Sequence, residues 1–180
     1  QSTGEVIGIG ADAEAALGKA LVAANLLPPP ASEERNLALL SIADRDKGLL
    51  GRLAAPLLAA GYVLAATPGT HAALAALGFA ASGAVPIGSQ TGDGLQIADL
   101  IRSGSVAVVV NTPTPQSGAL RDALEIRLAA VEEGVLCLTA METAVAAAEA
   151  LAVRRALDRI AIAPLGADGL RDHADPARKV

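Results

Sequence analysis

Three side chains with phosphate-binding chemistry, Lys47, Thr67 and Thr70, follow apolar runs that the sequence predicts to be buried strands. Lys47 is the only lysine between residues 36 and 163, and an ammonium is a point-charge partner for phosphate. Gly69 permits a close backbone turn, and the helix expected after it offers unpaired N–H groups at its N-terminus. The segment Thr67–Thr70 therefore predicts an anion site, although a threonine N-cap without a ligand explains the same residues.

Two more polar segments follow later apolar runs. Gly88 and Ser89 begin a glycine- and hydroxyl-rich loop, which either closes over a ligand or only connects a strand to a helix. Asn111 and Thr112 follow the most apolar run, where the asparagine amide either hydrogen-bonds a ribose or base edge or forms a turn. Because the carboxyl ends of neighbouring parallel strands meet at one edge of a sheet, these segments are expected to line one small-molecule site.

An alternation of continuous apolar runs and amphipathic segments must position these residues. It predicts the α/β class, a Rossmann-like doubly wound, five-stranded parallel sheet with helices on both faces. The expected strands are Leu37–Ile42, Tyr62–Ala66, Ala84–Ile87, Val106–Val110 and Val135–Thr139. The expected helices are Lys47–Ala60, His71–Leu77, Leu95–Arg102, Leu120–Glu133 and Glu142–Arg155. Glycines 61, 104 and 134 fall where helices should end, and Asp44 is expected to cap the first helix.

Three segments are expected along the 180 residues, which suffice for one domain with a real core. Residues 1–35 hold the end of a preceding region, a short helix at Asp12–Asn25 and the Pro28–Pro30 connector. Residues 36–163 form the sheet domain, which ends in a short strand at Asp158–Ile162. Residues 164–180 are expected to form a mobile tail.

Composition excludes several classes of partner. A net charge of −5 with only three lysines leaves no basic stripe for a nucleic acid. Tyr62 and Phe79 are the only aromatic residues, so a bound nucleotide must be held mainly through its phosphate and ribose. Leu53–Thr91 carries no formal charge, but prolines and glycines interrupt it, so we expect no membrane span.

The cysteine and histidine residues give no sign of a disulfide or a metal site. The single cysteine, Cys137, fits a reducing cytoplasm and is expected to be a small strand residue. No cysteine or second histidine lies near His71 or His173 in the sequence, so we expect no metal site.

Short motifs spread along the chain carry a resemblance to a known family. They are Ser2–Gly8 (STGEVIG), Leu40–Lys47 (LSIADRDK), Ala66–Thr70 (ATPGT), Val110–Pro113 (VNTP), Glu125–Arg127 (EIR) and Cys137–Thr139 (CLT). With them the chain resembles, over nearly its whole length, the carboxy-terminal allosteric domain of the carbamoyl-phosphate synthetase large chain, which is of the methylglyoxal-synthase-like group. In this comparison Ser2–Gly8 is similar to the end of the second ATP-grasp half.

The resemblance implies a regulatory receptor that has no catalytic residues and no cofactor of its own. In this family the parent enzyme is a cytoplasmic ATP-dependent ligase that uses Mg²⁺ or Mn²⁺. It makes carbamoyl phosphate from bicarbonate, glutamine-derived ammonia and ATP for pyrimidine and arginine biosynthesis. Its carboxy-terminal domain binds effectors such as UMP, IMP and ornithine. The implied partners are the rest of the large chain, the glutaminase small subunit and further copies in an oligomer.

The resemblance also implies a role for each matching residue. It assigns the effector phosphate to Lys47, Thr67, Gly69, Thr70, Gly88 and Ser89, the ribose or base to Asn111 and Thr112, and an ornithine-site contact to Thr139. Many relatives have a lysine where this chain has Gly88 and Ser89, and a basic segment where it has Thr114–Gly118. Losing one charge-assisted bond forfeits about 1.5–3 kcal/mol, so weak effector binding is expected.

Two other functions fit the same residues. One is a vestigial domain that only makes subunit contacts. The other is a methylglyoxal synthase, whose chemistry needs a carboxylate base and, in that family, a histidine beyond the fourth strand. Asp44, Asp46 and Asp93 offer carboxylates, but the sequence has no histidine between Asn111 and His173.

Overall fold

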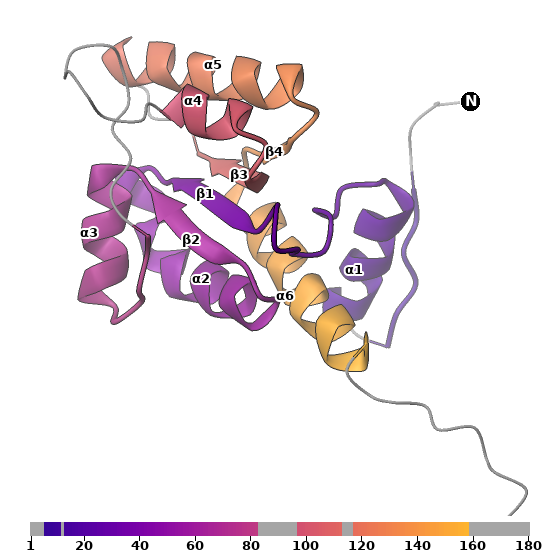
Figure 1. The fold of residues 1–180 in the computed structure, drawn as a ribbon. Coiled ribbons are helices and arrows are strands. Elements are labelled where there is room, and N and C mark those ends of the chain that lie inside the picture. Colours follow the sequence, from indigo (N-terminus) through magenta and orange to yellow (C-terminus); the bar gives the residue numbers. More distant parts are fainter. Residues whose placement is uncertain (1–5, 12, 83–96, 113–116, 159–180) are drawn as a thin grey trace, which may run out of the picture.

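A four-stranded parallel sheet forms the centre of this computed structural model, which describes residues 6–11, 13–82, 97–112 and 117–158 (Figure 1). The strands lie in the order β2-β1-β3-β4. Their bounds are Leu37–Ser41 (β1), Val63–Ala66 (β2), Val106–Asn111 (β3) and Leu136–Leu138 (β4). All three pairings are parallel, and Leu40 is in register with both Ala66 and Val110. The carboxyl ends of the strands therefore lie in one row.

Helices pack on both faces of the sheet, because successive strand residues point to opposite sides. Their bounds are Ala13–Ala23 (α1), Asp44–Leu49 (η1, a 3₁₀ helix), Leu50–Ala59 (α2), Pro68–Ala76 (α3), Ile97–Arg102 (α4), Ser117–Glu132 (α5) and Met141–Asp158 (α6). On one face, Leu40 shares a buried apolar cluster with residues of α2 and α6. On the other, Leu39 shares a second cluster with residues of α4 and α5 (Figure 1).

The N-terminal helix α1 lies outside this layer and packs against α6 (Figure 1). Contact between them is close, since a methyl group at Gly18 would lie 3.4 Å from the Cβ of Ala150. The connector that follows is tied to the sheet domain, because the Tyr62 hydroxyl donates a hydrogen bond to the Pro29 carbonyl oxygen.

The structure confirms the α/β class and a parallel sheet, and it corrects several boundaries. Four predicted strands are present, whereas Ala84–Ile87 lies outside the described residues. The helix after β2 begins at Pro68 rather than His71, since proline suits the first position of a helix. The strand predicted at Asp158–Ile162 is wrong at Asp158, which ends α6, and its remaining residues lie outside the described part.

Left-handed glycines end three helical segments as predicted. Gly61, Gly104 and Gly134 have φ values of +91°, +80° and +60° and stand just before β2, β3 and β4. Glycine adopts this conformation without the steric penalty of a Cβ atom. Within the described residues, no helix is long and apolar enough to cross a membrane.

Candidate functional site

Polar residues leave three neighbouring strands at the same edge of the sheet. The paired row of Ala66, Leu40 and Val110 is followed by Thr67 after β2, by Ser41 in β1 and by Asn111 in β3. Because β1 lies between β2 and β3, the segment that follows β1 lies between the segments that follow β2 and β3. The strand register thus places the predicted site at this edge.

Thr70 ties the first turn of α3 to the end of β1. Its Oγ1 atom accepts a hydrogen bond of 2.9 Å from the Ile42 backbone N–H and one of 3.1 Å from the Thr67 hydroxyl. The Thr70 residue is only 1% exposed. Thr70 therefore holds the framework of the site together.

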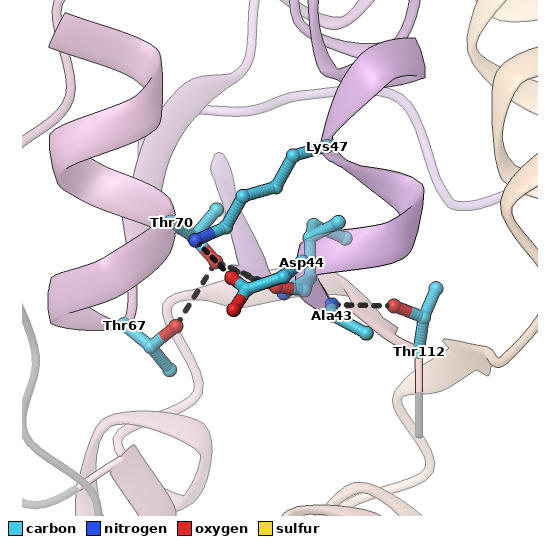
Figure 2. A network of polar contacts seen from close by, with 7 residues as sticks. Ala43, Asp44, Lys47, Thr67, Thr70 and Thr112 are labelled. Atoms are coloured by element: carbon cyan, nitrogen blue, oxygen red, sulfur yellow. Dashed lines mark hydrogen bonds and ion pairs between the residues drawn. The ribbon is translucent and has the colours of Figure 1, made fainter. Parts of the chain in front are cut away.

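Lys47 projects from η1 over the beginning of α3. A methyl group at Gly69 would lie 3.5 Å from the Lys47 Nζ atom, so the ammonium stands above the first helical turn. Figure 2 shows this ammonium beside Thr70 and the Asp44 carboxylate, with the Thr67 hydroxyl bonded to Thr70. Four of the residues predicted to hold a phosphate, Lys47, Thr67, Gly69 and Thr70, therefore come together.

The structure contradicts the prediction that Asp44 caps the following helix. The N-cap of η1 is Ala43, one residue earlier, and it makes no side-chain capping hydrogen bond. The Asp44 carboxylate instead forms an ion pair with Lys47, with 2.6 Å between Oδ1 and Nζ. Because the helix starts at Asp44, this side chain lies beside the first turn rather than ahead of it.

Thr67 likewise occupies the N-cap of α3 without capping it through its side chain. Its hydroxyl donates to Thr70 Oγ1, and its carbonyl oxygen accepts from the His71 N–H. The first N–H groups of a helix have no acceptor within the helix, and they carry a partial positive charge. An anion placed beside Gly69 would meet both these groups and the Lys47 ammonium.

Asn111 and Thr112 are buried and hydrogen-bonded to the backbone. The Asn111 Nδ2 atom donates to the Ala123 carbonyl oxygen at 3.2 Å, which joins β3 to α5. The Thr112 Oγ1 atom accepts from the Ala43 N–H at 2.8 Å (Figure 2). These residues are 1% and 4% exposed. To contact a ribose as predicted, these side chains would have to break their hydrogen bonds to the backbone or share them with the ribose.

The structure does not bring Thr139 to the Lys47 region. It is an exposed residue just after β4, at the opposite edge of the sheet from β2. Three strand spacings, or roughly 14 Å, separate the end of β4 from the end of β2. Gly88 and Ser89 lie outside the described residues.

A family model for the MGS-like domain matches residues 50–139, which is half of the chain. This chain belongs to the MGS-like domain family. The matched segment contains Thr67, Thr70, Asn111 and Thr112, while Lys47 precedes it by three residues.

The MGS-like domain is also similar to curated proteins that are much longer. The carbamoyl phosphate synthase large chain of Thermomicrobium roseum is 43% identical over 152 residues, which cover 84% of this chain and 14% of that protein. Large chains of the same name from Clostridium beijerinckii and Clostridium botulinum are 36% identical over 143 residues, or 79% of this chain and 13% of each protein. The chain thus spans 13 to 14% of the length of these relatives.

A cavity that sequence reasoning missed lies elsewhere in the MGS-like domain, between α1, α2 and α6. Its volume is about 200 Å³, and its lining includes Leu17, Arg52, Glu142 and Glu149. Arg52 and Glu149 form an ion pair across it at 3.0 Å. The residues are far apart in sequence and follow ordinary helical patterns, so no motif marks them.

Two further observations bear on the chemistry of the MGS-like domain. Burial raises the pKa of the Cys137 thiol, and the nearby Arg127 guanidinium opposes this shift in part. The neutral thiol is a poor nucleophile, which agrees with the prediction of an ordinary strand residue. No cluster of three or more histidine, cysteine, aspartate or glutamate residues that could hold a metal occurs in the described part of the chain.

Proposed function

We propose that this MGS-like domain is the effector-binding regulatory domain of a carbamoyl phosphate synthase large chain. Its ligand in this proposal is a nucleoside monophosphate such as UMP or IMP, held by its phosphate. The observation that supports this most strongly is the Lys47 ammonium, which stands over the Gly69 turn at the N-terminus of α3. Similarity to large chains of that name supports the assignment of the parent protein.

The phosphate would lie between Lys47 and the first turn of α3. Lys47 supplies one positive charge, and the backbone N–H groups of the turn supply donors and the positive end of the helix dipole. The Thr67 hydroxyl, which now donates to Thr70, is free to rotate its proton toward the ligand. Thr70 would keep its bond from the Ile42 N–H and hold the turn in place.

From the same assignment we infer the activity and the partners of the parent enzyme. The parent would be a cytoplasmic ATP-dependent ligase with Mg²⁺ or Mn²⁺, which works with a glutaminase small subunit in pyrimidine and arginine biosynthesis. Ornithine would be a second effector, with Thr139 at the edge of its site. An effector regulates such an enzyme only if it favours one state of the ATP-binding halves, a coupling typically of about 1–3 kcal/mol.

Removing the Lys47 ammonium should weaken nucleotide binding. We expect Lys47→Ala to reduce UMP affinity about 10- to 100-fold, the equivalent of one charge-assisted hydrogen bond. Isothermal titration calorimetry of the 180-residue chain with UMP and IMP measures this directly. Added salt should weaken binding to the unmodified chain, because the contact joins an ammonium to a dianion.

Lys19→Ala is the matched control, since Lys19 lies on α1 and its ammonium bonds the Ile9 carbonyl oxygen. It makes the same change of residue and charge away from the site. Equal UMP affinity in Lys47→Ala, Lys19→Ala and the unmodified chain would contradict the proposed site.

A second candidate function is a structural domain that contributes only subunit contacts. The buried hydrogen bonds of Thr70, Asn111 and Thr112 favour it, because the backbone of the chain supplies a partner for each of these side chains. Calorimetry separates the two functions. A folded chain that binds neither UMP, IMP nor ornithine would support the structural domain.

A further inference from the structure

The chain places its own carboxylate at the candidate phosphate site. Asp44 Oδ1 lies 2.6 Å from Lys47 Nζ, and the ammonium side chain is 26% exposed. Nearly all of the Asp44 side chain, 94%, is exposed. The contact is therefore a short ion pair whose acidic partner stands in solvent.

This ion pair solves an electrostatic problem within the fold. The Lys47 ammonium stands close to Gly69, at the positive end of the α3 dipole. Thr67 caps none of the N–H groups there with its side chain. Asp44 places a negative charge beside these two positive groups.

We propose that Asp44 is a built-in competitor of the effector phosphate, an extension that rests on the proposed function. A phosphate dianion bound to this ammonium would repel the Asp44 carboxylate, because both anions would lie against the same positive charge. Asp44 has to swing into solvent when the phosphate arrives, and its exposure permits that movement. The carboxylate thus raises the effector concentration that the domain needs, and it favours a dianion over weaker monoanions.

Replacement of Asp44 by asparagine removes the competing charge and keeps the shape of the side chain. Exposed ion pairs are weak, so we expect Asp44→Asn to increase the affinity for UMP about two- to fivefold. Inorganic phosphate, which offers the same dianion without a nucleoside, should gain by a similar factor.

Asp46 offers a matched control in the same helix. Its carboxylate pairs with the neighbouring Arg45 at 3.6 Å rather than with Lys47. Asp46→Asn changes the net charge of the chain by the same amount two residues away. The difference between the two variants therefore measures the competition for Lys47 rather than a general charge effect.

The experiment is calorimetric titration with UMP and with inorganic phosphate. It uses the unmodified chain, the single variants Asp44→Asn, Asp46→Asn and Lys47→Ala, and the double variant that combines Lys47→Ala with Asp44→Asn. We expect a larger gain for Asp44→Asn than for Asp46→Asn, and the gain should disappear in the Lys47→Ala background. If UMP binds through Lys47 but Asp44→Asn and Asp46→Asn change the affinity equally, the competitor role of Asp44 is overturned and the proposed function stands. If neither UMP nor IMP binds, or if the nucleotide binds independently of Lys47, the proposed function fails, and the competitor role of Asp44 fails with it.

Discussion

The two threonines of the candidate site have different tasks, although the sequence presents them as a pair. Thr70 is 1% exposed and accepts hydrogen bonds from Ile42 and Thr67. Thr67 is 7% exposed and only donates within this pair. A substitution at Thr70 is therefore expected to act mainly on stability, and one at Thr67 mainly on ligand binding.

Thr70→Val tests the structural role, because it leaves the Ile42 N–H buried without its acceptor. We expect the free energy of unfolding to fall by about 1–3 kcal/mol, measured by urea denaturation. The control Thr139→Val changes an exposed threonine and should stay within about 0.5 kcal/mol of the unmodified chain. Equal stability of both variants would show that the Thr70 bonds contribute little.

The sequence could predict which residues gather at the site but not how they pair. Lys47, Thr67 and Thr70 follow β1 and β2, and parallel neighbouring strands bring their carboxyl ends together whatever the side chains do. The partner of Asp44 depends on where η1 starts, and a shift of one residue turns a predicted cap into an ion pair. Boundaries at this precision depend on tertiary contacts such as the bond from Ala43 to Thr112.

Among the elements, β2 and the proline connector are joined through one side chain. Tyr62 stands just before β2, is 2% exposed, and its hydroxyl donates to the Pro29 carbonyl oxygen. The connector thereby lies against the sheet domain, close to Arg154 and Arg155 of α6. The hydrogen bond from Tyr62 attaches the predicted stiff connector to the sheet domain, and the composition of the connector does not predict this bond.

Burial raises the pKa of Tyr62 to about 12 from its ordinary value of 10.0, against the opposing charges of Arg155 and Arg154. The neutral phenol is favoured in the folded state, so its contribution to stability is present below pH 10 and is lost as the pH rises through about 12. Tyr62 is the only tyrosine and the chain has no tryptophan, so tyrosinate absorbance reports this residue alone. We expect titration near 12 in the folded chain and near 10 in urea.

A folded chain that titrates near pH 10 would contradict the buried position of Tyr62. Tyr62→Phe provides the control for stability. It should remove the part of the alkaline loss of stability that comes from this phenol, while other alkaline effects remain.

The main elements can be predicted from periodicity, because the strands are continuous apolar runs and left-handed glycines separate β2, β3 and β4 from the preceding helical segments. The start of α3 is harder to predict from the sequence. The sequence pattern predicts that this helix begins at His71, whereas in the structure it begins at Pro68, a residue that suits the first turn.

The chain spans 13 to 14% of the length of the curated relatives that it matches. The regulatory role proposed above would act through contacts with the rest of a large chain. What the chain itself provides is the sheet edge where β1, β2 and β3 end, and one ammonium set against a helix N-terminus. Ligand binding at that edge is the property on which the whole account depends.

Nuclear magnetic resonance of the ¹⁵N-labelled chain during titration with UMP tests that property most directly, because each backbone amide reports its own surroundings. We expect the largest shifts at the amides of Gly69 and Thr70, with a smaller response in η1 around Lys47. Shifts that gather instead around Arg52 and Glu149, at the cavity between α1, α2 and α6, or no shifts at all, would contradict the account.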